Sequence, residues 1–273
     1  MIDTFSKFSK RKILITSSDF ILQYSLQHPL LVSNALKQFD LLDHNLNLER
    51  PSRLEEQIRE GLRWDSSVHM PQIMWNVGTI GKGRLADFHI EDTNGCLLTI
   101  GVLMLALGLP GSASVLYGDE IGLPSITNSS LGVLESTSVM KWSEDSNIDP
   151  TISFCINKSV ETFGKLSAIR KDALPLHINA ILKFDQDIVE SRTHNYVFKM
   201  LPNNTVIVER FYPRRHRYLL ILNLGIKNVT HDLSNTYFGG QTLISSTGRK
   251  QGYVKLNQLI LSPGEGLLLL LDK

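Results

Sequence analysis

The pattern of apolar and polar positions changes once along the chain, near Leu174. In the first part, short apolar runs alternate with segments of helical spacing. The strands expected here are Lys12–Thr16, Leu30–Ser33, Gln72–Trp75 and Ala113–Tyr117. A strand–helix repeat predicts parallel strands joined by helical crossovers, and strands without internal alternation are buried on both faces.

The helices of this first part are recognised by their ends. The segment Pro51–Gly61 begins with proline and ends with glycine, which is the usual asymmetry of a helix. Ser17, Ser18 and Asp19 are suited to cap the run that follows them. Cys96–Leu109 is apolar nearly all round and predicts a buried helix, since it is shorter than the ~18 residues of a membrane-spanning helix.

The second part consists of strand-like runs separated by turn residues. These runs are Ile181–Phe184, Tyr196–Met200, Thr205–Phe211, Tyr218–Asn223, Gln241–Ser245, Tyr253–Leu256 and Gly266–Leu271. Such spacing without intervening helices predicts an antiparallel β-sandwich. The predicted fold is therefore α/β plus all-β, with a first domain over residues 1–174 and a second over 175–273. A helix near Val160–Lys171 connects the two.

Composition excludes several classes of function. Lys and Arg number 28 against 27 Asp and Glu, a net charge of +1, whereas a nucleic-acid binder normally carries a basic excess. The basic cluster Arg214–Arg217 predicts a solvated turn. No metal-binding or cofactor motif occurs, so neither a metal nor a cofactor is expected. Cys96 predicts a buried thiol, and the sequence leaves open whether it pairs with Cys155.

Four triplets fit the N-glycosylation acceptor pattern and favour an extracellular location. They begin at Asn128, Asn157, Asn203 and Asn228. As written, the chain carries neither a signal peptide nor a membrane anchor, so a secreted or membrane-anchored protein would have its targeting segment elsewhere.

The order of the pieces resembles the α-amylase family. Trp75 is followed by Arg84, then by the segment Leu107–Pro124, LGLPGSASVLYGDEIGLP, and then by the sandwich. In that family a (β/α)8 barrel precedes a C-terminal β-sandwich, and Gly118, Asp119 and Glu120 match the loop after the last barrel strand. A closed barrel needs eight strands. The resemblance therefore implies the C-terminal portion of a longer protein, with about the last four strands.

Two segments of the second part show a finer resemblance. Residues 209–225 and 248–273 are similar to the heavy subunits of heteromeric amino-acid transporters, which have amylase-like ectodomains without glycosidase activity. The resemblance implies a non-enzymatic function. The chain would bind a multispanning light subunit, stabilise it and bring it to the plasma membrane, with the ectodomain on the extracellular side. The membrane helix and adjacent cysteine that join the subunits in that family do not occur here.

The catalytic positions of the amylase family are occupied by other residues in this chain. Aligning on Arg84 places Thr79, Ile80 and Gly81 where the family has Asn, His and Asp. The family's proton donor follows a strand similar to Lys12–Thr16, where this chain has serines at positions 17 and 18. A serine hydroxyl cannot protonate a glycosidic oxygen as a carboxylic acid does. No catalytic residue is therefore predicted.

Asp119 and Glu120 predict a structural role. Adjacent side chains on a strand point to opposite faces, so these two carboxylates cannot converge on one bond. We expect one of them to fix the loop that follows the last barrel strand.

Two other functions remain open. The first is an α-glucosidase-type hydrolase whose catalytic groups lie outside this chain or are rebuilt from acids such as Asp19, although a first-turn aspartate also suits the helix dipole. The second is a carbohydrate-binding module that uses the same cleft without cleavage. Half a barrel leaves strand edges open, so an isolated chain of this length is expected to fold poorly. Soluble, monomeric expression with a cooperative melt would contradict that expectation.

Overall fold

The computed structural model describes most of the chain. The described residues are 13–48, 50–64, 70–78, 84–87, 95–123, 125, 150–172, 178–184, 187–193, 196–211 and 216–272.

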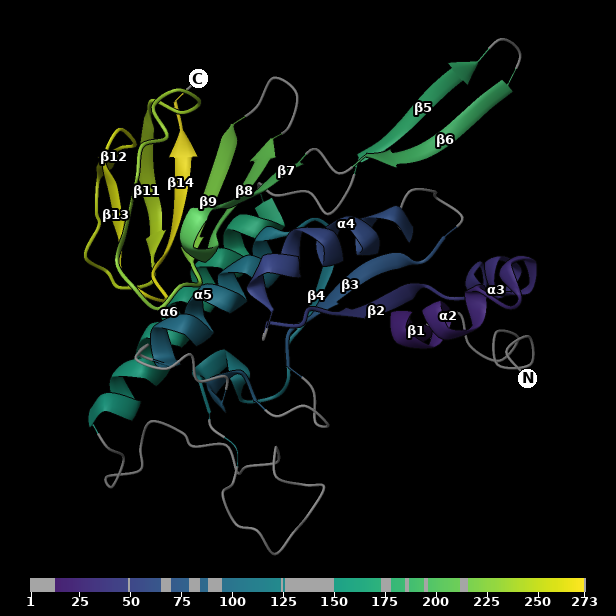
Figure 1. Cartoon of the computed structure of the whole chain (residues 1–273), viewed down its shortest axis with the longest axis horizontal. Helices are drawn as coiled ribbons and strands as arrows, with labels where there is room; N and C mark the ends of the chain where they lie inside the picture. The colour runs from purple at the N-terminus through teal and green to yellow at the C-terminus, as the bar shows by residue number, and fades with distance from the viewer. Residues whose placement is uncertain are drawn as a thin grey trace, which may run out of the picture.

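Four parallel strands form the first sheet, in the order β1–β2–β3–β4 (Figure 1). They are β1 (Ile15–Ser17), β2 (Leu41–Asn45), β3 (Gln72–Asn76) and β4 (Ser112–Ser114). The register pairs Ser17 with Asp43, and Asn45 with Asn76. The predicted parallel strands with helical crossovers are confirmed. The described residues do not close into a barrel.

The α-helices are α2 (Ser18–Ser25), α3 (Pro29–Leu36), α4 (Leu54–Trp64), α5 (Gly95–Gly108) and α6 (Pro150–Asp172). Short 3₁₀ helices are η1 (Pro51–Arg53), η2 (Leu85–Asp87), η3 (Asp119–Ile121) and η5 (Pro202–Asn204). Ser17 caps α2, because its side chain accepts a hydrogen bond from the Asp19 N–H at 3.3 Å. This confirms the predicted N-cap.

The C-terminal part is antiparallel. A six-stranded sheet has the order β12–β11–β14–β9–β8–β7, and β10 pairs with β13 in a small second sheet. The strands are β7 (Tyr196–Leu201), β8 (Thr205–Phe211), β9 (Arg217–Asn223), β10 (Val229–His231), β11 (Gly239–Ser245), β12 (Tyr253–Lys255), β13 (Leu259–Leu261) and β14 (Gly266–Leu271). A separate hairpin, β5 (Ile178–Phe184) and β6 (Asp187–Thr193), extends away from the body in Figure 1.

Helix α5 occupies the centre of the molecule. One continuous apolar core joins the helix-facing side of β2 and β3 to α5 and to one face of the six-stranded sheet. A second core covers the other face of that sheet under β10 and β13. Because both of its sides are apolar, α5 can be buried between two sheets, as its sequence predicted.

The parallel sheet has one covered face and one open face. Leu42 and His44 of β2 and Ile73 and Trp75 of β3 are buried on the side of the helices. The alternate residues, including Asp43, are less buried and lie on the opposite side. We call this opposite side the open face.

Several predicted elements differ from the structure. Leu30–Ser33 lies within helix α3, because Pro29 occupies the first turn and permits a helix where the apolar run suggested a strand. The second strand is instead Leu41–Asn45. The fourth strand is shorter than predicted, Ser112–Ser114.

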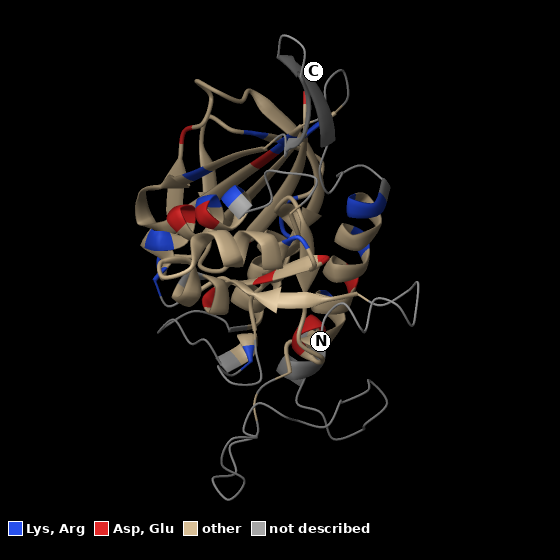
Figure 2. Ribbon diagram, turned by 90° about the vertical axis from the view of Figure 1, so that its right-hand side faces the viewer, with Lys and Arg blue, Asp and Glu red and all other residues tan. Residues whose placement is uncertain are grey.

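Cys96 is disulfide-bonded, so the prediction of a buried free thiol is wrong. In the described part of the chain, no helix has the length and apolarity to cross a membrane. Basic and acidic residues are interspersed over the described ribbon (Figure 2).

Candidate active site on the open face of the parallel sheet

Asp43 is the only acidic residue within the four parallel strands. In the register of β1 with β2, Asp43 pairs with Ser17, the last residue of β1. Paired residues of parallel strands point to the same face, so the side chains of Asp43 and Ser17 lie on the same side of the sheet. Neighbouring strands lie ~4.8 Å apart, so the Asp43 carboxyl is one strand spacing from Ser17. Acidic groups on the inner face near the carboxyl ends of barrel strands are typical of catalytic sites.

The surroundings of Asp43 shift the pKa of its carboxyl upward. Burial raises the pKa of the carboxyl, while a hydrogen bond from Asn76 and the nearby His44 lower it. Asp19 raises it further through charge repulsion. The Oδ1 atom is buried and has no hydrogen-bond partner among the described residues. A carboxyl whose pKa is raised in this way can hold and donate a proton.

Asn76 is held in position beside Asp43. Its Oδ1 accepts the Gly78 N–H at 3.3 Å, which leaves the amide NH2 to face the Asp43 carboxyl. The amide therefore donates to one oxygen of Asp43, and the other oxygen has no described partner.

Ser18 and His44 lie on the covered side of the sheet. Ser18 is 2% exposed, and its hydroxyl lies 2.9 Å from His44 Nδ1. The His44 Nε2 lies 3.1 Å from the Gln57 carbonyl oxygen of α4, so the ring donates there and accepts from Ser18. Burial lowers the pKa of His44. This pair joins β2 to α2 and α4, and it is separated from the open face by the sheet.

Arg84 and Asp119 form a buried ion pair. Arg84 Nη1 lies 3.4 Å from Asp119 Oδ1 and donates to the Tyr117 carbonyl oxygen at 2.5 Å. Asp119 is 1% exposed, and its Oδ2 has no hydrogen-bond partner within the described ranges. Gly78 lies directly against this carboxylate, because a Cβ at position 78 would be 2.3 Å from Oδ2. The pair therefore ties the segment after β3 to the loop after β4.

The acidic pair after β4 makes contacts within its own loop. Asp119 and Glu120 lie in the 3₁₀ helix η3, so the strand alternation used to predict that their side chains point apart does not apply to them. Glu120 Oε2 accepts the Gly118 N–H at 2.8 Å. Gly118 and Gly122 both have positive φ, 92° and 66°, which favours glycine at these two positions.

The stability of this loop is expected to depend on pH. Burial raises the pKa of Asp119 to about 7, above its ordinary value of 3.8, although Arg84 opposes the shift. Between these values the native state binds more protons than the unfolded state, so this contribution to stability is lost as the pH rises through about 7. As the pH rises from 5 to 7.5, the free energy of unfolding of Asp119→Asn should therefore increase relative to that of the wild type. Urea unfolding at several pH values measures the difference, and a difference independent of pH would contradict it.

The remaining predicted residues are distributed as follows. Thr79, Ile80, Gly81 and Asn128 lie outside the described residues. Asn157 on α6, Asn203 in η5 and Asn228 before β10 are exposed. No group of His, Cys, Asp and Glu within the described ranges has the arrangement of a metal site.

Comparisons with known proteins identify similar structures. No protein-family model and no curated protein matches the chain. Among solved structures, a trehalulose synthase MutB mutant in complex with Tris has a TM-score of 0.62 at 13% identity, covering 90% of this chain and 53% of that one. Trehalose-6-phosphate hydrolase from Bacillus licheniformis has a TM-score of 0.61 at 12% identity, covering 98% and 57%. Isomaltulose synthase from Klebsiella sp. LX3 has a TM-score of 0.57 at 11% identity, covering 86% and 51%.

The chain therefore shares the fold of these enzymes. It spans about half the length of these structures. This likeness fits the broader resemblance to amylase-type proteins, whereas the finer resemblance to transporter heavy subunits finds no support in it.

The prediction that the chain is not an enzyme is contradicted. The solved structures named above, which share its fold, are enzymes by name, namely trehalulose synthase, isomaltulose synthase and trehalose-6-phosphate hydrolase. That prediction considered Ser17, Ser18, Thr79, Ile80 and Gly81, with Asp19 as a possible replacement acid, and it overlooked Asp43. No sequence motif surrounds Asp43. Only the register of β1 with β2 reveals that it lies beside Ser17.

Proposed function

We propose that this chain is part of an α-amylase-type enzyme that cleaves or rearranges α-glucosides, with Asp43 as an acid on the open face. The position of Asp43 carries the proposal. It lies beside Ser17, where the amylase family has its proton donor, and its pKa is raised by burial. The names of the structural neighbours support the substrate class, since they are enzymes that act on or form glucosides.

The proposed step is a proton transfer coupled to cleavage of a glycosidic bond. Protonated Asp43 gives its proton to the glycosidic oxygen as the bond from that oxygen to the anomeric carbon breaks. The leaving sugar departs as an alcohol, and Asp43 becomes a carboxylate. A second carboxylate is needed to attack the anomeric carbon or to activate water. It would come from residues outside the four parallel strands, in which Asp43 is the only acid.

Asp43→Asn in the full-length protein tests this proposal. The substitution keeps the shape of the side chain and removes the titrating proton, so kcat on maltose should fall by about 100-fold or more. The matched control is Asp232→Asn, because Asp232 is an exposed acid that only caps a turn at Ser234. The control should keep wild-type turnover. Equal kcat for Asp43→Asn and the wild type would contradict the role of Asp43.

Partnership with another protein is a second candidate function, and it does not exclude catalysis. Apolar side chains of α2, α3 and the segment between them are exposed: Phe20, Tyr24, Leu26, Leu30 and Leu31. Leu26 is 90% exposed and Leu30 is 81% exposed. Exposed apolar patches mark sites of protein or membrane contact. This patch favours a polypeptide contact, which the resemblance to transporter heavy subunits attributes to a multispanning light subunit.

Affinity purification of the full-length protein from its native membranes tests the partnership. Recovery of a multispanning protein that is lost with Leu26→Ser and Leu30→Ser together would support it. Thr230→Ser, an exposed change far from α2 and α3 in the sequence, is the control. Recovery that is unchanged by the two leucine substitutions would contradict a role for this patch.

The extracellular location remains a proposal, and two features support it. Cys96 is disulfide-bonded, and disulfides persist mainly in oxidising compartments. Asn228 and Thr230, which form one acceptor triplet, are both exposed. We therefore expect enzymatic removal of N-glycans to lower the apparent mass of the protein purified from its own cells, and Asn228→Gln to remove one glycan. An unchanged mass after the treatment would contradict this location.

A further inference from the structure

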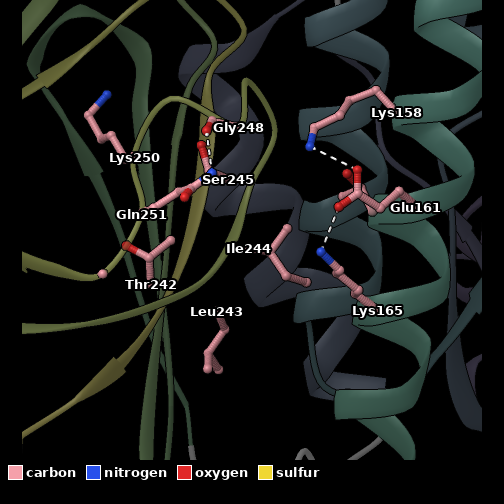
Figure 3. Close-up of a pocket in the computed structure, with 12 residues that line it drawn as sticks. Lys158, Glu161, Lys165, Thr242, Leu243, Ile244, Ser245, Gly248, Lys250 and Gln251 are labelled. Carbon is pink, nitrogen blue, oxygen red and sulfur yellow. Dashed lines mark hydrogen bonds and ion pairs between the residues drawn. The ribbon is translucent and has the colours of Figure 1, made fainter.

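A cavity of about 170 Å³ lies between helix α6 and the β11–β12 edge of the six-stranded sheet (Figure 3). It is formed by the exposed side of α6, by four consecutive residues of β11 and by the turn after that strand. The walls of this cavity belong to α6 and the six-stranded sheet. The cavity is therefore separate from the open face of the parallel sheet. A volume of this size holds about five water molecules or one small solute.

A bulge in β11 opens the cavity. The register of β11 with β14 shifts between Thr242 and Ile244. In a regular strand, successive side chains alternate between faces, whereas here Thr242, Leu243, Ile244 and Ser245 all line the cavity. Bulges turn side chains in this way and occur often beside functional sites.

The charged side chains around the cavity are mainly cationic. Lys158 and Lys165 project from α6, and Lys250 comes from the opposite wall (Figure 3). Glu161 bridges the two lysines of α6, at 3.0 Å from Lys158 Nζ and 2.6 Å from Lys165 Nζ. Glu265, behind the wall, contacts Lys250 at 2.5 Å. The three ammonium groups exceed the two carboxylates by one charge.

Two of these lysines are held close to the cavity. The side chains of Lys158 and Lys250 are only 17% and 24% exposed. Gly248, with φ of 70°, leaves room for the ammonium of Lys158, because a Cβ there would be 3.4 Å from Nζ. Partly buried ammonium groups attract an anion more strongly than fully solvated ones, since water screens them less.

Thr242 Oγ1 is buried and makes no hydrogen bond with any described residue. Because this oxygen is enclosed, the lysines are the groups that can reach an anion in the cavity. No aromatic ring lines the cavity within the described residues, so the stacking surface that commonly binds a sugar ring is missing there.

We propose that this cavity binds a small phosphate-class anion, either inorganic phosphate or the phosphate group of a phosphorylated sugar. The ammonium groups of Lys158 and Lys250 bind the anion from opposite walls. Glu161 holds Lys158 and Lys165 in place and disfavours a bulky or highly charged anion by repulsion.

Calorimetric titration of the full-length protein tests the site, with inorganic phosphate, glucose 6-phosphate and glucose as separate ligands. We expect saturable binding of at least one phosphate-bearing ligand and none of glucose. Binding of inorganic phosphate indicates a free-anion site, whereas binding of glucose 6-phosphate alone indicates a phosphorylated sugar. The absence of saturable binding of both at millimolar concentration would overturn the proposal.

Two variants locate the binding. Lys158→Ala with Lys250→Ala should weaken it at least tenfold. Lys255→Ala, an exposed lysine on β12 that does not line the cavity, is the control and should bind as the wild type does. Unchanged binding in the double lysine variant would overturn the assignment to this cavity.

Discussion

Trp75→Ala is expected to lower the free energy of unfolding by about 3–5 kcal/mol. Trp75 is fully buried on β3, and its indole N–H donates to the Pro110 carbonyl oxygen at 2.5 Å. Its ring meets the His44 ring edge-on, with the centroids 5.6 Å apart. The side chain therefore connects β2, β3 and the turn before β4, and alanine would leave a cavity at that junction.

Urea unfolding at neutral pH measures this effect, and Trp75→Phe separates its two causes. Phenylalanine keeps most of the buried ring and loses the N–H, so its cost should be smaller, about 1–3 kcal/mol. The close approach of Gly61 on α4 belongs to the same contact, since a Cβ there would lie 2.8 Å from the Trp75 ring. If Trp75→Ala unfolds at the same urea concentration as the wild type, the junction does not stabilise the fold.

Arg170→Met is expected to cost about 3–4 kcal/mol of stability, since unsatisfied buried groups are individually expensive. The guanidinium of Arg170, on α6, donates to the carbonyl oxygens of Leu107, Leu109 and Gly111; the bond to Leu109 is 3.0 Å long. These carbonyls lie at the C-terminal end of α5 and in the turn that leads to β4. Helix α5 has no basic residue in its own last turn, so a cation from α6 supplies the favourable charge.

The matched control is Lys171→Met, because Lys171 is the exposed neighbour of Arg170 on the same helix. Both substitutions remove one positive charge, but only Arg170→Met leaves carbonyls without donors. Burial lowers the pKa of Arg170 to about 10, so the arginine remains charged at neutral pH. Thermal melts of the two variants should therefore differ clearly, and equal melting temperatures would contradict this role.

Strongly patterned elements of this fold could be predicted from the sequence. The strands of the six-stranded sheet and the helix α5 are dominated by apolar residues that pack in two cores, so their patterns are clear. Strand β2 was missed because its sequence, LLDHN, contains three polar residues. Its histidine can be buried only because Ser18 and the Gln57 carbonyl satisfy both ring nitrogens. Those partners are distant in sequence.

The candidate site could be predicted only in part. The absence of acids at positions 17 and 18 was visible in the sequence. The neighbouring position of Asp43 depends on the pairing of β1 with β2, which are separated by two helices. The role of Asp119 was partly predicted, since the sequence indicated a local interaction. The partner, Arg84, was identifiable only once the loops after β3 and β4 were seen in contact.

The most direct test of the central claim is the dependence of Asp43→Asn turnover on the leaving group. A general acid matters for maltose, whose leaving alcohol is poor, and matters little for 2,4-dinitrophenyl α-glucoside, whose leaving group needs no proton. In the full-length protein, we predict that Asp43→Asn loses about 100-fold or more in kcat on maltose and keeps most of its kcat on the dinitrophenyl glucoside. An equal loss on both substrates, or no turnover of either by the wild type, would contradict the assignment of Asp43 as the acid of an amylase-type enzyme.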